Sequence, residues 1–392
     1  MSYAHREEIY DADSHMMETP NWIAEFADPK IRPYLEPFVG GRKETLAEID
    51  KALLRFKKRQ NNPEQANHAK KEFMSMKHKG WNGLGAFDQK ERTQAIDLLG
   101  FKGQIVFPTS AFNQVIEAKT KKILMGGVTA LNRGLASFCK DDRRMIPVAY
   151  IPLGLGPNLA KTFLDEAINM NFSVILIDTI APKGYSSFTH PEYDKVWAAI
   201  QDADLAITLH VGVDGGYSPV PLSFYENASL VPTHKEGDAP ADALSYMAIQ
   251  YNAELFLSAM IFDGVMQRFP KLRIGVIELG ASWIISWMKH LDQSYKAFRK
   301  LQDLSKLKLL PSEYVLRQVK VTPFAGEDIG WILNSGAEDL LMFASDYPHH
   351  EGTDDPIGRF EKTMEGVDEK VRNKFYSNNF KAFLGKRLSH YS

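Results

Sequence analysis

Short apolar runs rich in Val and Ile recur along the chain, and longer stretches with helical spacing of apolar residues separate them. Strands buried on both faces lose the apolar–polar alternation of half-exposed strands, so these runs predict a parallel sheet. The predicted strands cover residues 8–13, 103–109, 145–151, 172–178, 205–211, 273–279, 318–324 and 340–346.

Helical stretches fill the intervals between these runs. The clearest predicted helices cover residues 88–100, 157–171, 242–270 and 281–301. Strands that alternate with helices predict the α/β class, and eight such units predict a (β/α)8 TIM barrel. A doubly wound open sheet is the alternative, but no G-x-G-x-x-G follows the first strand.

Two strand-to-helix loops are long enough to be insertions. Residues 19–87 follow the first strand, residues 213–240 follow the fifth, and both would lie at the carboxyl face of a barrel. The first contains the basic segment 51–73, which predicts a solvated helix or, alternatively, a lid that meets an anionic substrate. The second is rich in Gly, Pro and aromatic residues and is predicted to be an active-site loop. We predict a single domain over residues 1–392.

Composition narrows the class of protein. The 392 residues are 44% hydrophobic and 24% charged, with a formal net charge of −2, so nothing indicates a nucleic-acid partner. The single cysteine excludes an intramolecular disulfide and a cysteine-based zinc site. No apolar run reaches the ~18 residues of a membrane span, and the N-terminus lacks a signal-type apolar core. We therefore expect a cytoplasmic protein that is not in the membrane.

Polar side chains stand at the ends of several predicted strands. Asp13 and His15 lie two residues apart, which places them on one face of the first strand. His210, Glu278 and Asp346 end the fifth, sixth and eighth strands. Each alone is more often a turn or a structural residue. Together they would meet at one barrel mouth, where buried charges are costly unless they are paired or bind a metal. The pattern predicts a metal site.

The donor types restrict the metal. Imidazole and carboxylate groups without a thiolate suit a divalent transition metal such as Zn²⁺, Fe²⁺ or Mn²⁺. Two histidines with one or two carboxylates would leave a position open for water or substrate, as catalytic sites require.

These residues and several flanking motifs resemble the amidohydrolase superfamily. The motifs are "LHVG", "RFPKLRIGVIELGASWI", "LMFASDYPHHEG" and "NKFYSNNFKAFLG", with the Asp–His pair of the first strand. The chain is similar to the amidohydrolase-related branch that includes aminocarboxymuconate semialdehyde decarboxylase and γ-resorcylate decarboxylase. This resemblance implies a metal held by Asp13, His15, His210 and Asp346, with Asp346 also exchanging protons during turnover.

The chain departs from that family pattern at two strands. Most members have H-x-H on the first strand, whereas this chain has Asp13 in the first place, as γ-resorcylate decarboxylase similarly has an acid. The family's decarboxylases end the sixth strand with His, and this chain has Glu278 there. Glu278 would therefore be an acid/base group or, with Glu18, a ligand of a second metal. One metal per chain and two per chain both stay open.

Three functions follow from this site. The first is a metal-dependent hydrolase in which Asp346 takes a proton from activated water to cleave an amide, ester or thioester. Its substrate would be a small carboxylate-bearing or CoA-like molecule. The alternative is a non-oxidative decarboxylase of an aromatic or unsaturated carboxylic acid. The third is a metal-binding barrel without catalysis.

Three further residues are candidates for substrate binding. Asn113 follows the second strand, His234 lies in the second long loop, and His349 follows the last-strand motif. A turn residue or a loop cap is the ordinary alternative for each. We expect a small anionic molecule as the partner, and the resemblance implies a homodimer because relatives commonly form dimers.

Overall fold

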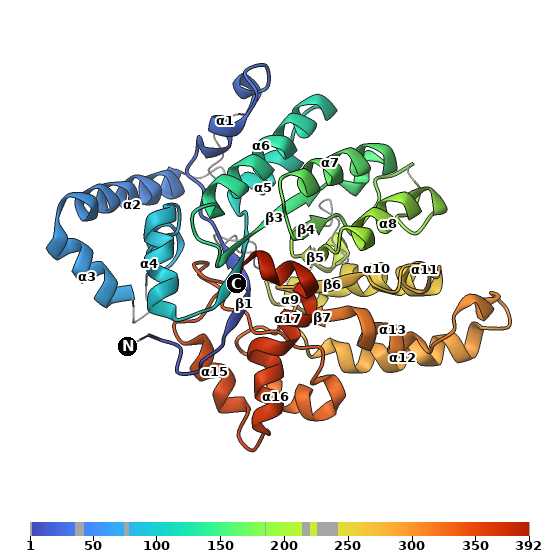
Figure 1. Cartoon of the computed structure of the whole chain (residues 1–392). Coiled ribbons are helices and arrows are strands. Elements are labelled where there is room, and N and C mark those ends of the chain that lie inside the picture. The colour runs from blue at the N-terminus through green and yellow to red at the C-terminus, as the bar shows by residue number, and fades with distance from the viewer. Residues whose placement is uncertain are drawn as a thin grey trace. The chain divides into compact units, whose positions relative to one another are not determined.

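The computed structural model describes residues 2–35, 43–73, 78–184, 186–213, 220–225 and 242–391, and shows parallel strands alternating with helices (Figure 1). The chain divides into two compact units. The first unit comprises Met1–Tyr150, Ala344–Arg359 and Ser389–Ser392, and the second comprises Ile151–Phe343 and Phe360–Leu388. The α/β class is confirmed, whereas one domain over the whole chain stays a prediction.

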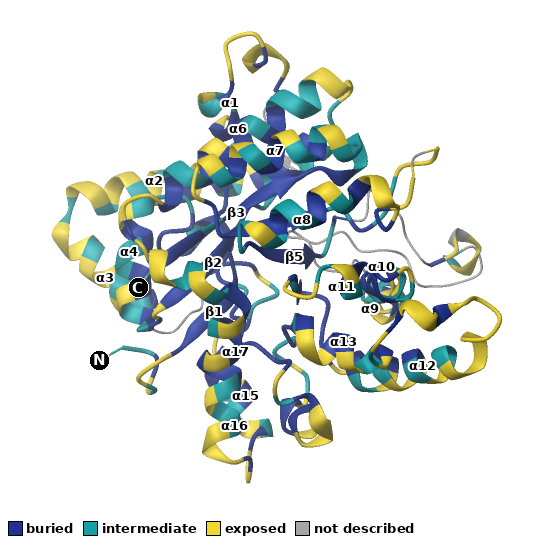
Figure 2. Cartoon of the chain, turned by 45° about the vertical axis from the view of Figure 1, so that its right-hand side comes forward, coloured by how far each residue is buried: buried dark blue, intermediate teal, exposed yellow. Residues whose placement is uncertain are grey.

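The sheet of the first unit is built from three parallel strands. They are β1 (Tyr10–His15), β2 (Gly103–Phe107) and β3 (Met145–Ile151), within a few residues of the predicted runs. β1 and β2 are buried along their whole length, and in β3 only Pro147 is partly exposed (Figure 2). The register between β1 and β2 shifts between Asp11 and Ser14. The carboxyl end of β1 therefore departs from a regular ladder.

The insertion after β1 is largely helical, as predicted for residues 51–73. The helices of the first unit are α1 (Trp22–Phe26), α2 (Lys43–Asn61), α3 (Pro63–Phe73), α4 (Gln89–Leu99), α5 (Ser110–Ile116) and α6 (Lys121–Cys139). Helix α3 lies against both α2 and α4 (Figure 1). Ile49 and Ala52 of α2 pack with Met17 and Trp81 in one apolar cluster. Hydrophobic burial thus anchors the insertion next to the end of β1.

The second unit contains four parallel strands and most of the remaining helices. The strands are β4 (Val174–Ile177), β5 (Ala206–His210), β6 (Arg273–Ile277) and β7 (Val319–Val321). The helices are α7 (Pro157–Asn169), α8 (Asp194–Asp202), α9 (Ala243–Ala248), α10 (Tyr251–Phe262), α11 (Val265–Arg268), α12 (Trp283–Phe298), α13 (Pro311–Gln318), α14 (Ile329–Ile332), α16 (Glu369–Asn373) and α17 (Asn379–Leu384). Helix α15 (Pro356–Thr363) begins in the first unit and ends in the second.

The helix predicted over 242–270 is three shorter helices. Gly264, with φ 75°, separates α10 from α11 because glycine adopts the left-handed conformation without steric cost. Of the predicted loop 213–240, the structure describes only Val213 and residues 220–225, including a 3-10 turn at Leu222–Tyr225. Among the described residues, no helix is both long and apolar enough to cross a membrane.

The predicted eighth strand, 340–346, is an extended segment with isolated bridges. Within the second unit, Leu341 pairs with Val321 in parallel, and within the first, Tyr347 pairs with Ser14. The extended conformation stops at Asp346, whose φ of 53° lies in the left-handed region. The prediction of a regular strand over 340–346 is therefore wrong, because Leu341 alone forms a bridge within it, and closure into a (β/α)8 barrel stays a prediction.

Candidate metal centre

Four side chains of the first unit meet where β1 ends. His15 Nε2 lies 3.3 Å from Asp13 Oδ1 and 3.7 Å from Asp346 Oδ1. His349 Nδ1 lies 3.2 Å from the same Asp346 oxygen, and its ring stacks on His15 at 3.7 Å between centroids. We call Asp13, His15, Asp346 and His349 the β1 cluster. Only the Asp346 side chain, 14% exposed, reaches solvent to a significant extent.

The histidines of the β1 cluster are held by protein oxygens on one ring nitrogen each. His15 Nδ1 lies 3.2 Å from the Pro108 carbonyl, and His349 Nε2 lies 2.9 Å from Thr109 Oγ1. The Thr109 hydroxyl donates to the Met16 carbonyl at 2.9 Å, so it accepts from His349. These bonds assign the N–H to one nitrogen and turn the lone pair of the other toward a carboxylate.

This arrangement of imidazole nitrogens and carboxylate oxygens is stable only with a positive charge between them. A neutral imidazole lone pair and a carboxylate oxygen are both acceptors, so they repel unless a proton or a cation lies between them. Carboxylate and imidazole donors fit a divalent transition metal by both charge and donor type. The β1 cluster therefore offers a metal-binding set made of residues from one unit.

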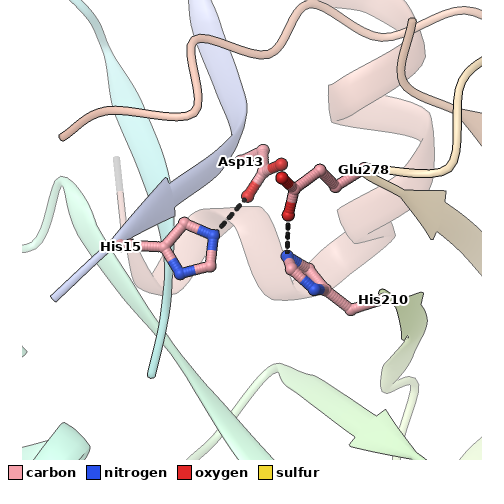
Figure 3. Close-up of side chains that lie close together, drawn as sticks. All are labelled: Asp13, His15, His210 and Glu278. Carbon is pink, nitrogen blue, oxygen red and sulfur yellow. Dashed lines mark ion pairs between the residues drawn. The ribbon is translucent and has the colours of Figure 1, made fainter. Parts of the chain in front are cut away.

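The second unit repeats this arrangement with a single pair. His210 ends β5, and Glu278 directly follows β6, whose Ile277 pairs with His210 in the ladder. His210 Nε2 lies 3.4 Å from Glu278 Oε2, while Nδ1 lies 3.1 Å from the Val211 carbonyl. Figure 3 shows the dashed ion pair of His210 with Glu278 and that of His15 with Asp13. Both members of the second-unit pair are buried.

Two of these carboxylates stand on strained backbone. Glu278 has φ 54° and Asp346 has φ 53°, a region that side chains other than glycine rarely adopt. Hydrogen bonds hold both positions: the Glu278 N–H donates to Thr322 Oγ1 at 3.0 Å, and the Asp346 N–H donates to the Asp13 carbonyl at 2.9 Å. Such strain persists where the surrounding structure fixes a side chain for function.

Glu18, a predicted ligand of a second metal, is engaged by backbone donors. Its carboxylate accepts the Thr109 N–H at 3.0 Å and the Ala111 N–H at 3.3 Å, at the start of α5. Burial raises the pKa of Glu18 to about 7. This geometry gives Glu18 an anchoring role for α5, and its role as a metal ligand stays a prediction.

The three residues predicted to bind substrate lie in different places. His349 belongs to the β1 cluster, as described above. Asn113 lies in α5 and is half-buried, and its carbonyl accepts the Glu117 N–H at 3.0 Å. His234 lies outside the described residues.

Asp11 is a buried acid beside the β1 cluster, and the sequence did not lead us to predict a role for it. It is 0% exposed, and burial raises its pKa to about 7 although Ser345 and Gln104 donate hydrogen bonds to it. The strand period already indicated this position, because Asp11 precedes Asp13 by two residues and therefore shares its face.

Two buried cationic side chains, Lys79 and Arg92, were also not predicted from the sequence. Lys79 Nζ lies 5.3 Å from the centre of the Tyr347 ring, and the Arg92 guanidinium carbon lies 5.2 Å from it. Neither charged group makes a hydrogen bond within the described part of the chain. Burial lowers the pKa of Lys79 to about 8, and Asp346 is the carboxylate that opposes this effect most. No sequence signal marks these residues, because both come from the insertion and its following helix.

Comparison with known proteins gives a family and a set of similar folds. The sequence profile of the family described as "Amidohydrolase" matches residues 78–386. No curated protein matches the chain. The structure is similar to an amidohydrolase from Mycobacterium avium subsp. paratuberculosis K-10, with TM-score 0.73, 19% identity, and coverage of 97% of this chain and 100% of that chain.

The other similar structures include several decarboxylases. The 2,6-dihydroxybenzoate decarboxylase from Rhizobium has TM-score 0.63 and 17% identity, covering 97% of this chain and 99% of that chain. The dihydroxybenzoic acid decarboxylase from Polaromonas sp. JS666, solved with bound manganese and the inhibitor 2-nitroresorcinol, has TM-score 0.63 and 16% identity, covering 98% of both chains. At these identities the likeness concerns the fold.

Proposed function

Because the chain belongs to the amidohydrolase family, we propose that it is a metal-dependent decarboxylase of a small aromatic or unsaturated carboxylic acid. The decarboxylases among the structures of similar fold support this reaction over the hydrolysis that the sequence first favoured. The β1 cluster supports the metal dependence, since His15 Nε2 faces the carboxylates of both Asp13 and Asp346.

The proposed ligands are those that the resemblance implies: Asp13, His15, His210 and Asp346. Mn²⁺ is the first metal to test, because carboxylate-rich donor sets suit it and a decarboxylase of similar fold was solved with manganese. Such a cation, when bound, supplies a Lewis acid that fixes and polarises the substrate's carboxylate and a neighbouring oxygen.

The chain's own residues supply the proton transfer. Asp346 is the most exposed member of the β1 cluster, so it is the carboxyl group that a substrate can reach. We assign it the delivery of a proton to the carbon that carries the leaving carboxylate. His349 Nδ1, 3.2 Å from Asp346 Oδ1, accepts the proton of that carboxyl group in a hydrogen bond when Asp346 is protonated, and Thr109 orients the His349 ring.

Hydrolysis is the second candidate, and Glu278 favours it. The carboxylate of Glu278 lies 3.4 Å from His210. At position 278 the resemblance leads us to expect a histidine in a decarboxylase. A carboxylate at that position would serve as a general base for water. A variant with Glu278→His should then raise decarboxylation relative to hydrolysis.

The test is an activity panel with one diagnostic variant. We expect the Mn²⁺-loaded protein to release CO₂ from hydroxybenzoates or related unsaturated acids and to leave lactones and amides intact. Asp346→Asn should lower CO₂ release by about 10³-fold or more, in line with the removal of a general acid. Circular dichroism would check that the variant is folded. Turnover of lactones or amides alone would contradict the decarboxylase and support the hydrolase.

A further inference from the structure

A fully buried carboxylate, Asp11, lies beside the proposed metal ligands and binds none of the cluster's side chains. Its Oδ1 accepts the Ser345 N–H at 2.9 Å and the Asp13 N–H at 3.2 Å. Its Oδ2 accepts the Ser345 hydroxyl at 2.6 Å and the Gln104 amide at 2.7 Å. Four donors from three chain segments therefore meet on one carboxylate.

These donors belong to the backbone segments that carry two proposed ligands. The Asp13 N–H donates to the Asp11 carboxylate where the β1–β2 register shifts. At this point a side-chain oxygen therefore takes the hydrogen bond that a backbone carbonyl of β2 would accept in a regular ladder. Ser345 directly precedes Asp346, whose own N–H donates to the Asp13 carbonyl at 2.9 Å. Asp11 thus fixes the positions of Asp13 and of the strained Asp346 relative to each other.

A carboxylate matches this set of donors because both of its oxygens accept hydrogen bonds. Asn would present an amide N–H₂ to the Ser345 hydroxyl, which already donates, although the Gln104 amide could turn its oxygen toward that group. The Ser345 hydroxyl cannot easily reverse its role, because its oxygen accepts the Tyr347 N–H at 3.2 Å. Replacing one oxygen of Asp11 therefore disturbs the segment on which Asp346 stands.

We propose that Asp11 is a positioning residue that sets the metal affinity of the β1 cluster by holding the backbone of Asp13 and Asp346 in register. The inference rests on the proposed function, because it takes these two residues to be metal ligands. Partners that orient metal ligands typically contribute 10–100-fold to metal affinity. Asp11 reaches the ligands through their main chain, which distinguishes it from a residue that binds the metal.

The variant Asp11→Asn tests this proposal in the full-length protein. We expect its dissociation constant for Mn²⁺, measured by competition with a chelating dye, to rise by about 10–100-fold. The matched control is Asp142→Asn, since Asp142 is a buried carboxylate of the same unit that pairs with Arg144. This control should lower the thermal midpoint of the apoprotein and leave the Mn²⁺ affinity unchanged.

If Asp11→Asn does not fold, the variant Ser345→Ala tests the positioning role of Asp11 instead. Removing one donor of the four should weaken Mn²⁺ binding by about threefold to tenfold, and Ser345→Thr should restore it because the hydroxyl is kept. Wild-type affinity in Asp11→Asn or in Ser345→Ala would overturn the positioning role. An absence of Mn²⁺, Zn²⁺ and Fe²⁺ binding in the wild-type protein would instead overturn the proposed function, so the two failures are distinguishable.

Discussion

At the scale of single residues, the three histidines share one way of being held. In His15 and in His210, Nδ1 lies at hydrogen-bond distance from a backbone carbonyl oxygen. In His349, Nε2 lies at hydrogen-bond distance from the Thr109 hydroxyl. In each case the second ring nitrogen faces a carboxylate within 3.4 Å. A shared arrangement on three separate segments is typical of metal sites, where the second nitrogen's bond fixes the tautomer.

Lys79 provides a prediction for the pH dependence of stability. Burial lowers its pKa to about 8 in the folded chain, whereas an unfolded lysine titrates near 10.4. Between these values the unfolded chain binds more protons, so the free energy of unfolding should rise with pH by about 1.4 kcal/mol per pH unit. This contribution is lost as the pH falls through 8.

Urea unfolding of the apoprotein at two pH values, 7.5 and 9.5, measures this effect. The Lys79→Met variant should show a smaller rise than the wild type, whereas Lys90→Met, an exposed lysine on α4, should match the wild type. Parallel curves for the wild type and Lys79→Met would show that the ammonium group is already solvated in the folded chain.

At the scale of elements, helix α5 depends on a residue far from it in the sequence. Glu18 accepts the Thr109 and Ala111 N–H groups, and the orphan donors at a helix start are costly when buried without an acceptor. Glu18→Ala should therefore lower the free energy of unfolding by about 1–3 kcal/mol. Glu18→Gln, which keeps an acceptor oxygen, should cost less.

The same pair of variants examines the second-metal prediction for Glu18. If Glu18 only anchors α5, the metal content of Glu18→Gln should equal that of the wild type, as elemental analysis would measure. A loss of one metal per chain in Glu18→Gln, with stability retained, would make Glu18 a ligand and contradict the anchoring role.

The strands were predictable because their apolar runs report burial on both faces. Seven predicted runs contain or overlap a strand, and the residues expected at three strand ends, His15, His210 and Glu278, lie at or next to those ends. The eighth run misled because Asp346 adopts a left-handed conformation that no hydrophobic pattern signals. Lys79 and Arg92 were not predicted because only packing reveals their burial, whereas the strand period places Asp11 on the same face as Asp13.

At the scale of the whole molecule, each compact unit contains a histidine–carboxylate set at the ends of its parallel strands. The family profile spans residues 78–386 and therefore includes segments of both units. The first-unit residues Asp13 and His15 lie before the matched range, so their role depends on the geometry of the β1 cluster. Catalysis by a metal held by the proposed ligands is accordingly the central claim.

Metal content per chain tests that claim most directly. The protein would be loaded with Mn²⁺, freed of excess metal and measured by elemental analysis together with His15→Ala and His210→Ala. We predict close to one metal per wild-type chain and a strong loss in both variants. No bound metal in the wild type, or full metal content in either variant, would contradict the account.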